Sequence, residues 1–373
     1  MRFRLPPEAE AFRDEVREFL APWRDLNGFF HQDREWDRVR AFYRALGERN
    51  WLALGWPVEM GGLGASPLHE FILWDEAAYA RVARPPLSAG VVAKTIVRAG
   101  TPEQHDRWLP PIRRGEIHFS LGYSEPQAGS DLASVRTRAE LREDGYVVQG
   151  EKCWTSYAQH SDHLWLLCRT GSVSDKSAAV SLLIVDLDAS GVTVSPLPTL
   201  DGEQLNAVHL DAVEVAADRR IGPEGGAWKL MSAALADERH VQFPPRRLRR
   251  DLEDVVSSLA EGGCLGDAEV RRRVADLAVG VREVELLGLH VVEQVERGHA
   301  AVAEAAANKV AHTELAQRIA EAALELGGPE ALACDRPAEF LWRQSLWETI
   351  GGGTSEVMRS VVARQALRLG GRR

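Results

Sequence analysis

The sequence predicts an α+β protein of three domains, in the order helical, β-rich and helical. Two observations carry this prediction. Apolar residues recur at helical spacing in the first and last thirds of the 373-residue chain, whereas short runs rich in Val, Leu and Ile fill the middle third. We place the domains at residues 1–116, 117–223 and 224–373, with the strands of the second forming a barrel-like or sandwich domain.

The amino-terminal third begins with a predicted helix. Its apolar residues are three or four apart, and they are Phe12, Val16, Phe19, Leu20 and Trp23. The Gly- and Pro-rich segment GWPVEMGGLGASP then predicts a loop over Gly55 to Pro67. Helical spacing resumes after the loop and continues to about Arg114.

The period changes in the middle third. Strands are predicted for five runs that Gly, Asp, Ser and Pro separate: YVVQG, LWLLCRT, AVSLLIVDL, GVTVSPL and AVHLDAVEV. From Trp228 onward the helical period returns. Near-heptad spacing there joins Val270, Val274, Leu277, Val281, Val284 and Val291, and a later helix carries Leu315, Ile319, Ala322 and Leu326. This last third is predicted to be a helix bundle.

Composition narrows the function classes. Apolar residues make up 45% of the chain and include 11 Trp, which is enough for a sizeable core. The net charge of -10 argues against a nucleic-acid partner, and charges throughout the first residues argue against a signal peptide or membrane insertion. The four cysteines are scattered singly, so no metal site is expected. We expect a cytoplasmic enzyme.

Five stretches in order along the chain resemble the acyl-CoA dehydrogenase family. They are FRDEVREFL near the start, GYSEPQAGSDLASVRTRA, GEKCWTSYAQHSDHLWLLCRT, IGPEGGAWKLMSAALADER and IGGGTSEVMRSVVARQAL. The resemblance implies a helical domain, a middle β domain and a carboxy-terminal four-helix bundle, assembled as a homotetramer or as a heterotetramer with a related subunit. It also implies an FAD cofactor, an acyl-CoA substrate and an electron acceptor such as an electron-transferring flavoprotein.

The resemblance assigns cofactor contacts to four parts of the chain. The implied FAD-binding residues are Leu121, Ser124, Ser130, Trp154, Thr155, Ser156, Gly327, Gly328, Thr354 and Glu356. The residues Leu121 to Ser130 pass from a strand into a Gly-containing turn, where backbone N–H groups and a hydroxyl can approach an electron-accepting ring. A large aromatic at Trp154 could cover the flavin, although a lone Trp at a strand end is more often core. Thr354 and Ser355 could equally cap the final helix, with Glu356 facing its positive end.

The reaction requires a carboxylate beside the α carbon of the thioester, opposed by hydrogen bonds to the carbonyl oxygen. Many family members carry this Glu directly before Gly-Thr-Ser, but here three glycines precede Thr354. A minority places it on a bundle helix before an Arg, and Glu238–Arg239 matches that position. Trp228, Met231, Leu235 and Glu238 also follow a helical stripe, so we expect a desolvated carboxylate at Glu238.

Two other interpretations of this segment remain open. Glu238 could merely pair with Arg239 or with a bundle neighbour, and Asp237 is the reserve candidate for the base. Gly352 lacks the carboxylate but keeps its N–H, which the resemblance implies donates to the thioester carbonyl. The implied substrate-binding residues are Ser130, Gly352 and Arg239. The absent side chain at Gly352 also vacates volume, which predicts tolerance of branched or bulky acyl groups.

The chain departs from the family in one motif. Relatives usually carry Arg-x-x-Phe-Gly in the bundle to contact the FAD of a neighbouring subunit, whereas this chain reads SSLAEGGCLGDAEVRRRVADL. Arg271, Arg272 and Arg273 could supply phosphate contacts, although a solvated helical face is favoured for at least two of them. This departure resembles actinobacterial relatives that act on bulky acyl-CoAs, some of them two-component heterotetramers with fewer flavins than chains.

Three functions are therefore weighed. The first is flavin-dependent α,β-dehydrogenation of an acyl-CoA, with Glu238 as base and Gly352 polarising the thioester. The second is a flavin-poor or non-catalytic partner subunit of a heterotetramer. The third is an oxidase or monooxygenase on the same fold. Because the flavin motifs all survive, the first is favoured.

Overall fold

The computed structural model describes residues 4–171, 178–238, 240–334 and 336–369, and the side chains of residues 235–237 also lie outside this description. The chain divides into two compact units. The first, the bundle unit, comprises Met1–Phe29, Pro67–Ala83 and Arg239–Arg373. The second, the sheet unit, comprises Phe30–Ser66 and Arg84–Glu238. The short helix α2 (Gly28–His31) spans the first point where the chain passes from one unit to the other.

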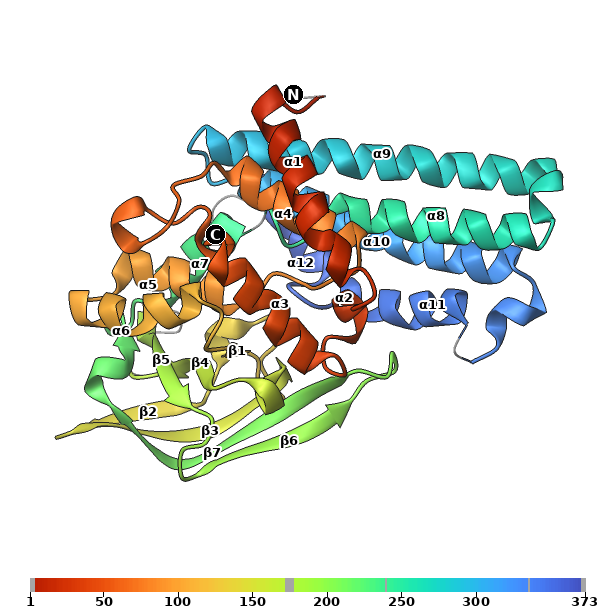
Figure 1. Cartoon of the computed structure of the whole chain (residues 1–373). Helices are drawn as coiled ribbons and strands as arrows, with labels where there is room; N and C mark the ends of the chain where they lie inside the picture. The colour runs from red at the N-terminus through yellow and green to blue at the C-terminus, as the bar shows by residue number, and fades with distance from the viewer. Residues whose placement is uncertain (1–3, 172–177, 239, 335, 370–373) are drawn as a thin grey trace. The chain divides into compact units, whose positions relative to one another are not determined.

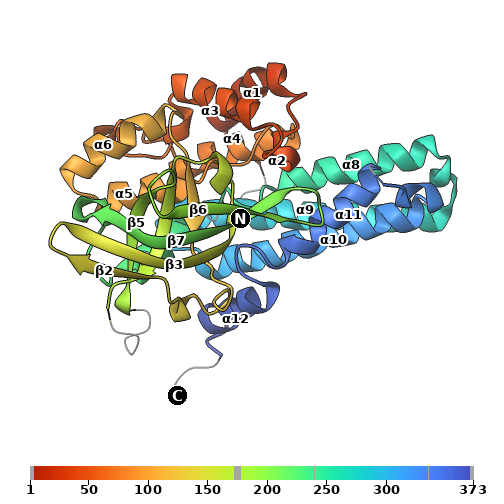
Figure 2. The same ribbon diagram turned by 90° about the horizontal axis from the view of Figure 1, so that it is seen from below.

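The bundle unit is built from long helices, of which α9 (Ala268–Glu296) and α10 (Val302–Leu326) pack against each other. Figures 1 and 2 label both helices. Its other helices are α1 (Pro7–Leu20), α4 (Pro67–Tyr79), α8 (Pro245–Glu261), α11 (Pro337–Glu348) and α12 (Ser355–Gln365). The heptad spacing of α9 is confirmed as a packing face, since it buries Leu277, Val281, Val284 and Val291. The predicted helical bundle is therefore present.

Two helices of the amino-terminal third belong to this bundle unit. Phe71 and Ile72 of α4 share a core cluster with Ala9 of α1 and Val292 of α9. A Cβ at Gly288 of α9 would lie 3.5 Å from Phe71, which is an ordinary van der Waals contact, so this packing does not depend on glycine there. α1 and α4 therefore belong to one unit, although the segment Phe30–Ser66 between them in the sequence belongs to the sheet unit.

The sheet unit contains an eight-stranded sheet in the order β6-β7-β3-β2-β4-β5-β8, with β1 pairing to β4 in parallel. The strands β6, β7, β3 and β2 follow one another in Figure 2. The strand bounds are β1 Phe119–Gly122, β2 Arg138–Arg142, β3 Gly145–Ser156, β4 His163–Arg169, β5 Val180–Asp186, β6 Val192–Pro198, β7 Gln204–Ala216 and β8 Arg220–Ile221. The predicted β-rich middle third is confirmed.

Alternating residues of the strands build the core of the sheet unit. Val148 of β3, Leu166 of β4, Leu183 of β5 and Val208 of β7 are all fully buried in one cluster. The unit also contains the helices α3 (Trp36–Glu48), α5 (Ala93–Ala99), α6 (Pro102–Arg113) and α7 (Ala227–Glu238), and a π-helical turn η4 (Ser88–Val92). In the described part of the chain, no helix has the length and apolar character needed to cross a membrane.

Candidate active site

The turn that follows β1 carries the first group of predicted residues. Leu121 lies on β1 opposite Trp165 of β4, and the chain turns immediately afterwards. The Ser124 carbonyl accepts the backbone N–H of Cys153 at 3.0 Å, which ties the turn to β3. Ser124 is half-buried and Ser130 is exposed, so both positions can meet a ligand on this edge.

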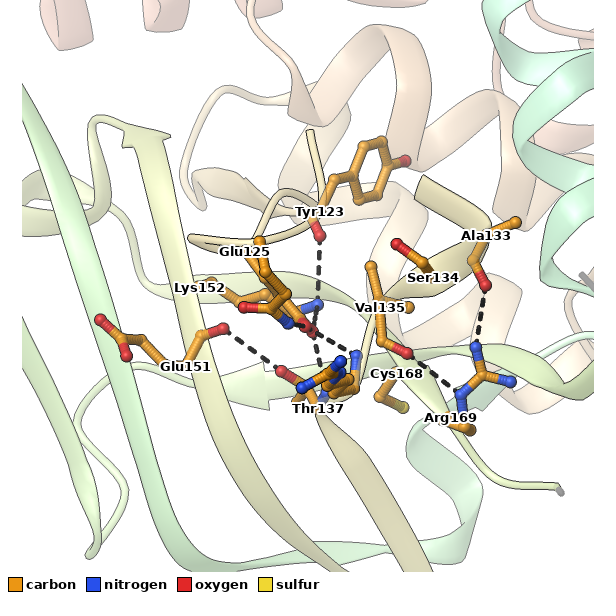
Figure 3. A network of polar contacts seen from close by, with 12 residues as sticks. Tyr123, Glu125, Ala133, Ser134, Val135, Thr137, Glu151, Lys152, Cys168 and Arg169 are labelled. Atoms are coloured by element: carbon orange, nitrogen blue, oxygen red, sulfur yellow. Dashed lines mark hydrogen bonds and ion pairs between the residues drawn. The ribbon is translucent and has the colours of Figure 1, made fainter. Parts of the chain in front are cut away.

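A buried ion pair beneath the turn fixes its shape (Figure 3). Lys152 Nζ lies 2.8 Å from Glu125 Oε1, and it donates to the Tyr123 carbonyl oxygen at 3.1 Å. The side chains of Lys152 and Glu125 are 0% and 2% exposed. In Figure 3 the Tyr123 ring points away from this network. Because Tyr123 and Glu125 flank Ser124, the ion pair holds the predicted flavin-contacting turn from below.

Backbone donors complete the environment of Glu125. Its carboxylate accepts the N–H groups of Arg136 at 2.7 Å and Thr137 at 2.8 Å, and the Gln127 amide at 2.6 Å. Burial alone would raise the pKa of Glu125, but Lys152 and the N–H donors outweigh burial and leave the pKa below its usual value. The carboxylate is therefore held ionised.

A β-bulge in β3 turns Trp154 out of the sheet. The register with β7 shifts between Lys152 and Thr155, so two residues of β3 face one residue of β7. Trp154 takes a left-handed φ of 59° and its side chain is 60% exposed. Thr155 is fully buried, and its carbonyl accepts the Asn206 amide at 3.0 Å, which holds the strand beyond the bulge. Ser156 is half-buried at the strand end.

This edge of the sheet unit fits a planar cofactor. A large aromatic held outward by a bulge exposes an apolar face, which is costly unless another group covers it. The hydroxyls of Ser124 and Ser130 are accessible on the turn that hydrogen-bonds to the same strand. The predicted contacts of Trp154, Ser124 and Ser130 with FAD are compatible with this geometry, whereas the buried Thr155 side chain is not accessible.

Glu238 ends α7 and is only 4% exposed. Its carboxylate lies against Gly90 of η4, where a Cβ built on Gly90 would be 1.4 Å from Oε1. Burial raises the pKa of Tyr123, a hydrogen bond with Trp165 lowers it, and the negative charge of Glu238 raises it further. The expected desolvation of Glu238 is therefore present. Arg239 and the side chain of Asp237 lie outside the described residues.

The apolar stripe predicted for α7 is wrong at one end. Met231 is 4% exposed, whereas Trp228 is 41% exposed. Met231 and Glu238 are seven residues apart, which is close to two helical turns, so both lie on the same face of α7. Ten residues are roughly 2.8 turns, which rotates Trp228 well away from that face.

Gly352 belongs to the bundle unit and adopts a left-handed φ of 67°, which L side chains rarely take. Within the described residues of that unit, a Cβ at Gly352 would meet Phe243 Cζ at 3.9 Å. The backbone conformation therefore favours glycine, and among the described residues of that unit Phe243 alone lies within 4 Å of a Cβ built there.

The final helix begins as its capping pattern predicts. Thr354 is the N-cap of α12, and its Oγ1 accepts the Val357 N–H at 3.2 Å. Backbone N–H and the Thr354 side chain lower the pKa of Glu356, so it is anionic at the positive end of the helix. Gly327 and Gly328 lie at the carboxyl end of α10, where Gly328 has a φ of 69°. Capping accounts for these four residues, and their contacts with FAD remain predictions.

The three consecutive arginines of α9 all form hydrogen bonds or ion pairs within the bundle unit. Arg271 donates to the carbonyl oxygens of residues 265 and 266, Arg272 pairs with two carboxylates of its own helix, and Arg273 pairs with Glu325. Arg271 and Arg272 are exposed. The interpretation as a solvated helical face is therefore confirmed for these two.

A groove of about 780 Å³ on the sheet unit is distinct from these residues. Three of its lining residues interact with one another, since Asp186 accepts from Arg219 at 2.9 Å and lies 2.7 Å from His163 Nδ1. None of the predicted site residues lines it. In the described part of the chain, no group of three or more His, Cys, Asp or Glu side chains is placed to hold a metal ion.

Sequence reasoning missed three residues of this arrangement. Lys152 and Glu125 stand inside the quoted motifs, but Lys152 directly follows Glu151 in a stretch of mixed polarity, so no local pattern signalled their burial. Gly90 gave no signal, because its partner Glu238 is far away in the sequence and only the fold brings them together.

Family models match nearly the whole chain. They are described as the N-terminal domain of acyl-CoA dehydrogenase at residues 6–116, its middle domain at 120–213 and its C-terminal domain at 228–367. Among proteins of Mycobacterium tuberculosis, acyl-CoA dehydrogenase FadE29 is 33% identical over 98% of both chains. Acyl-CoA dehydrogenase FadE26 of the same organism is 35% identical over 99% of both.

Solved structures agree with the sequence relatives. A structure titled Tcur3481-Tcur3483 steroid ACAD superposes with a TM-score of 0.91, at 32% identity over 99% of both chains. The ChsE4-ChsE5 complex from Mycobacterium tuberculosis superposes with a TM-score of 0.90, at 34% identity over 99% of both chains.

Proposed function

We propose that this chain, which belongs to the acyl-CoA dehydrogenase family and is an FAD-dependent oxidoreductase, oxidises a bulky acyl-CoA with Glu238 as the base. The product is the trans-2-enoyl-CoA. The burial of the Glu238 carboxylate, at 4% exposure, is the observation that carries the proposal.

The proposed chemistry removes two hydrogens from adjacent carbons. The Glu238 carboxylate takes the α proton and becomes the carboxylic acid, while the electron pair of that C–H bond forms the new double bond. When bound, FAD would supply the acceptor for the β hydrogen, which leaves as a hydride, and an acceptor such as an electron-transferring flavoprotein would then collect the two electrons. Burial suits Glu238 to this role, because a carboxylate with few water contacts is a stronger base.

Other residues of the chain polarise the thioester and bind the cofactor. The Gly352 N–H is proposed to donate to the thioester carbonyl as negative charge develops there. Trp154, Ser124 and Ser130 are proposed to contact FAD, and Arg239 and Ser130 to contact the substrate. The accessible hydroxyls and the exposed Trp154 ring support this assignment on the sheet unit.

The substrate class is proposed from two observations. No side chain at Gly352 occupies the volume beside Phe243. Relatives of similar length include a protein titled steroid ACAD. Both favour an acyl group with a branched or polycyclic end over a short straight chain. The titles of two-component complexes among these relatives support a related partner subunit.

Anaerobic titration of the purified flavoprotein with acyl-CoAs tests the proposal. We expect a steroid or α-branched acyl-CoA to bleach the flavin absorbance, and Glu238→Gln to slow bleaching by at least about 10²-fold. Glu224→Gln is the matched control, because Glu224 is an exposed Glu of the same unit paired with Arg220. Unchanged bleaching in Glu238→Gln would contradict the base, and a strict preference for short straight chains would contradict the substrate class.

A further inference from the structure

We propose that Gly90 is a positioning residue for the base, and that its missing side chain provides the space in which the Glu238 carboxylate is held. This inference rests on the proposed role of Glu238. A Cβ at Gly90 would lie 1.4 Å from Glu238 Oε1, 2.6 Å from Cδ and 3.5 Å from Cγ. The carboxylate therefore occupies the volume that any side chain at position 90 would need.

The requirement for glycine at position 90 is steric. Gly90 is absent from the glycines with positive φ, so an alanine could adopt its backbone conformation. All three atoms nearest to the built Cβ belong to Glu238. The Cβ of an alanine at this position would therefore overlap the Glu238 carboxylate, and no other residue would lie as close to it.

The backbone of η4 is held in place and cannot easily retreat. Trp56 Nε1 donates to the Ala89 carbonyl oxygen at 3.2 Å, and Trp56 is 1% exposed. Thr95 Oγ1 donates to the Val91 carbonyl oxygen at 2.6 Å. The carbonyls on both sides of Gly90 are thus fixed by buried side chains. Single π-helical turns are frequent at functional sites.

A side chain at position 90 would displace the carboxylate and leave the other binding groups in place. Trp154 and Ser124 lie on the β3 bulge and the turn after β1, not on η4. Gly90→Ala should therefore lower kcat by about 10²-fold, since a misplacement near 1 Å has that cost. Flavin content and the affinity for a non-reducing acyl-CoA product should stay unchanged.

Rescue by a shorter acid separates positioning from a general structural defect. Glu238→Asp withdraws the carboxylate by one methylene and removes the conflict with a Cβ at position 90. Gly90→Ala should lower kcat by about 10²-fold in the wild-type background and by less than about threefold in the Glu238→Asp background. Equal costs in the two backgrounds would overturn the inference.

Thermal unfolding of the holoenzyme gives a readout that does not depend on turnover. Gly90→Ala should lower Tm by about 2–6 °C, as expected for overpacking. In a Glu238→Ala background the same change should leave Tm unchanged or raise it, because the conflict is gone. Gly266→Ala is the matched control, since nothing in the described structure lies within 4 Å of a Cβ there and its φ is not positive.

The outcomes distinguish this inference from the proposed function. Full activity in Glu238→Gln would refute the base, whereas the coupled Tm effect of Gly90 and Glu238 would still stand. An inactive Glu238→Gln together with a fully active, fully stable Gly90→Ala would refute the positioning role alone.

Discussion

Lys152 carries a positive charge into the interior of the sheet unit, where its side chain has no solvent contact. A buried ammonium is tolerated only with close partners, and Glu125 and the Tyr123 carbonyl supply them. Because these partners flank Ser124, the electrostatics of one ion pair set the shape of the turn proposed to meet the flavin.

The ion pair predicts a specific pH dependence of stability. Glu125 has a pKa in the folded chain below its value of 4.5 in the unfolded chain, so its contribution is complete above pH 4.5 and is lost as pH falls through the lower folded value. Glu125→Gln should lower the free energy of unfolding at pH 7 by about 3–5 kcal/mol, because it leaves Lys152 unpaired.

Urea unfolding at pH 7 and at pH 3.5 measures this effect. The difference in the free energy of unfolding between wild type and Glu125→Gln should be smaller at pH 3.5 than at pH 7. Glu140→Gln, which removes an exposed carboxylate paired with Arg142, should change the free energy of unfolding by less than about 1 kcal/mol at either pH. A larger difference in the free energy of unfolding at pH 3.5 would contradict a stabilising ion pair between Glu125 and Lys152.

Irregular elements carry the candidate site. Trp154 stands on a bulge of β3 and Gly90 on the π-helical turn η4, and each departs from the regular period of its neighbours. Regular strands and helices bury one face, whereas a bulge or a π-turn redirects a single residue. The exposure of Trp154 depends on the bulge, and the space for the Glu238 carboxylate depends on the π-helical turn.

The amino end of α12 makes a testable contribution to stability. Thr354→Ala removes the side-chain acceptor for the Val357 N–H and should lower the free energy of unfolding by about 1 kcal/mol, while Thr354→Ser should retain it. Denaturant unfolding of the holoenzyme measures the change, and flavin absorbance shows whether the cofactor is also lost. Equal destabilisation by both substitutions would exclude capping as the cause.

At the scale of the molecule, the two units divide the amino-terminal third. Helices α1 and α4 pack in the bundle unit, whereas α3, α5 and α6 belong to the sheet unit. The domain boundaries at residues 116 and 223 remain predictions drawn from the change of period. Sequence periodicity reports which face of a helix is buried, but not which neighbour covers it.

The bundle unit exposes large apolar side chains, which predicts that copies of the chain associate into an oligomer through this unit. Trp347 and Ile350 near the end of α11 are 40% and 64% exposed. Light scattering of the purified chain should give a mass above the monomer, and the pair Trp347→Asp and Ile350→Asp should reduce it. Leu141→Asp on β2, at a residue 57% exposed in the sheet unit, is the control. A monomeric wild type would contradict self-assembly and leave a related subunit as the partner.

The sequence by itself determined the order of helical and β segments and the family, and it predicted the burial of Glu238, because period and motif are local properties of the chain. It also predicted the cap at Thr354 and the solvated arginines of α9. Only the tertiary structure decided that Trp228 faces outward, that Thr155 is inaccessible and that Gly90 seats the Glu238 carboxylate. The last two depend on contacts between segments far apart in the chain, which no local pattern encodes, whereas the outward direction of Trp228 follows from helical geometry once the buried face of α7 is known.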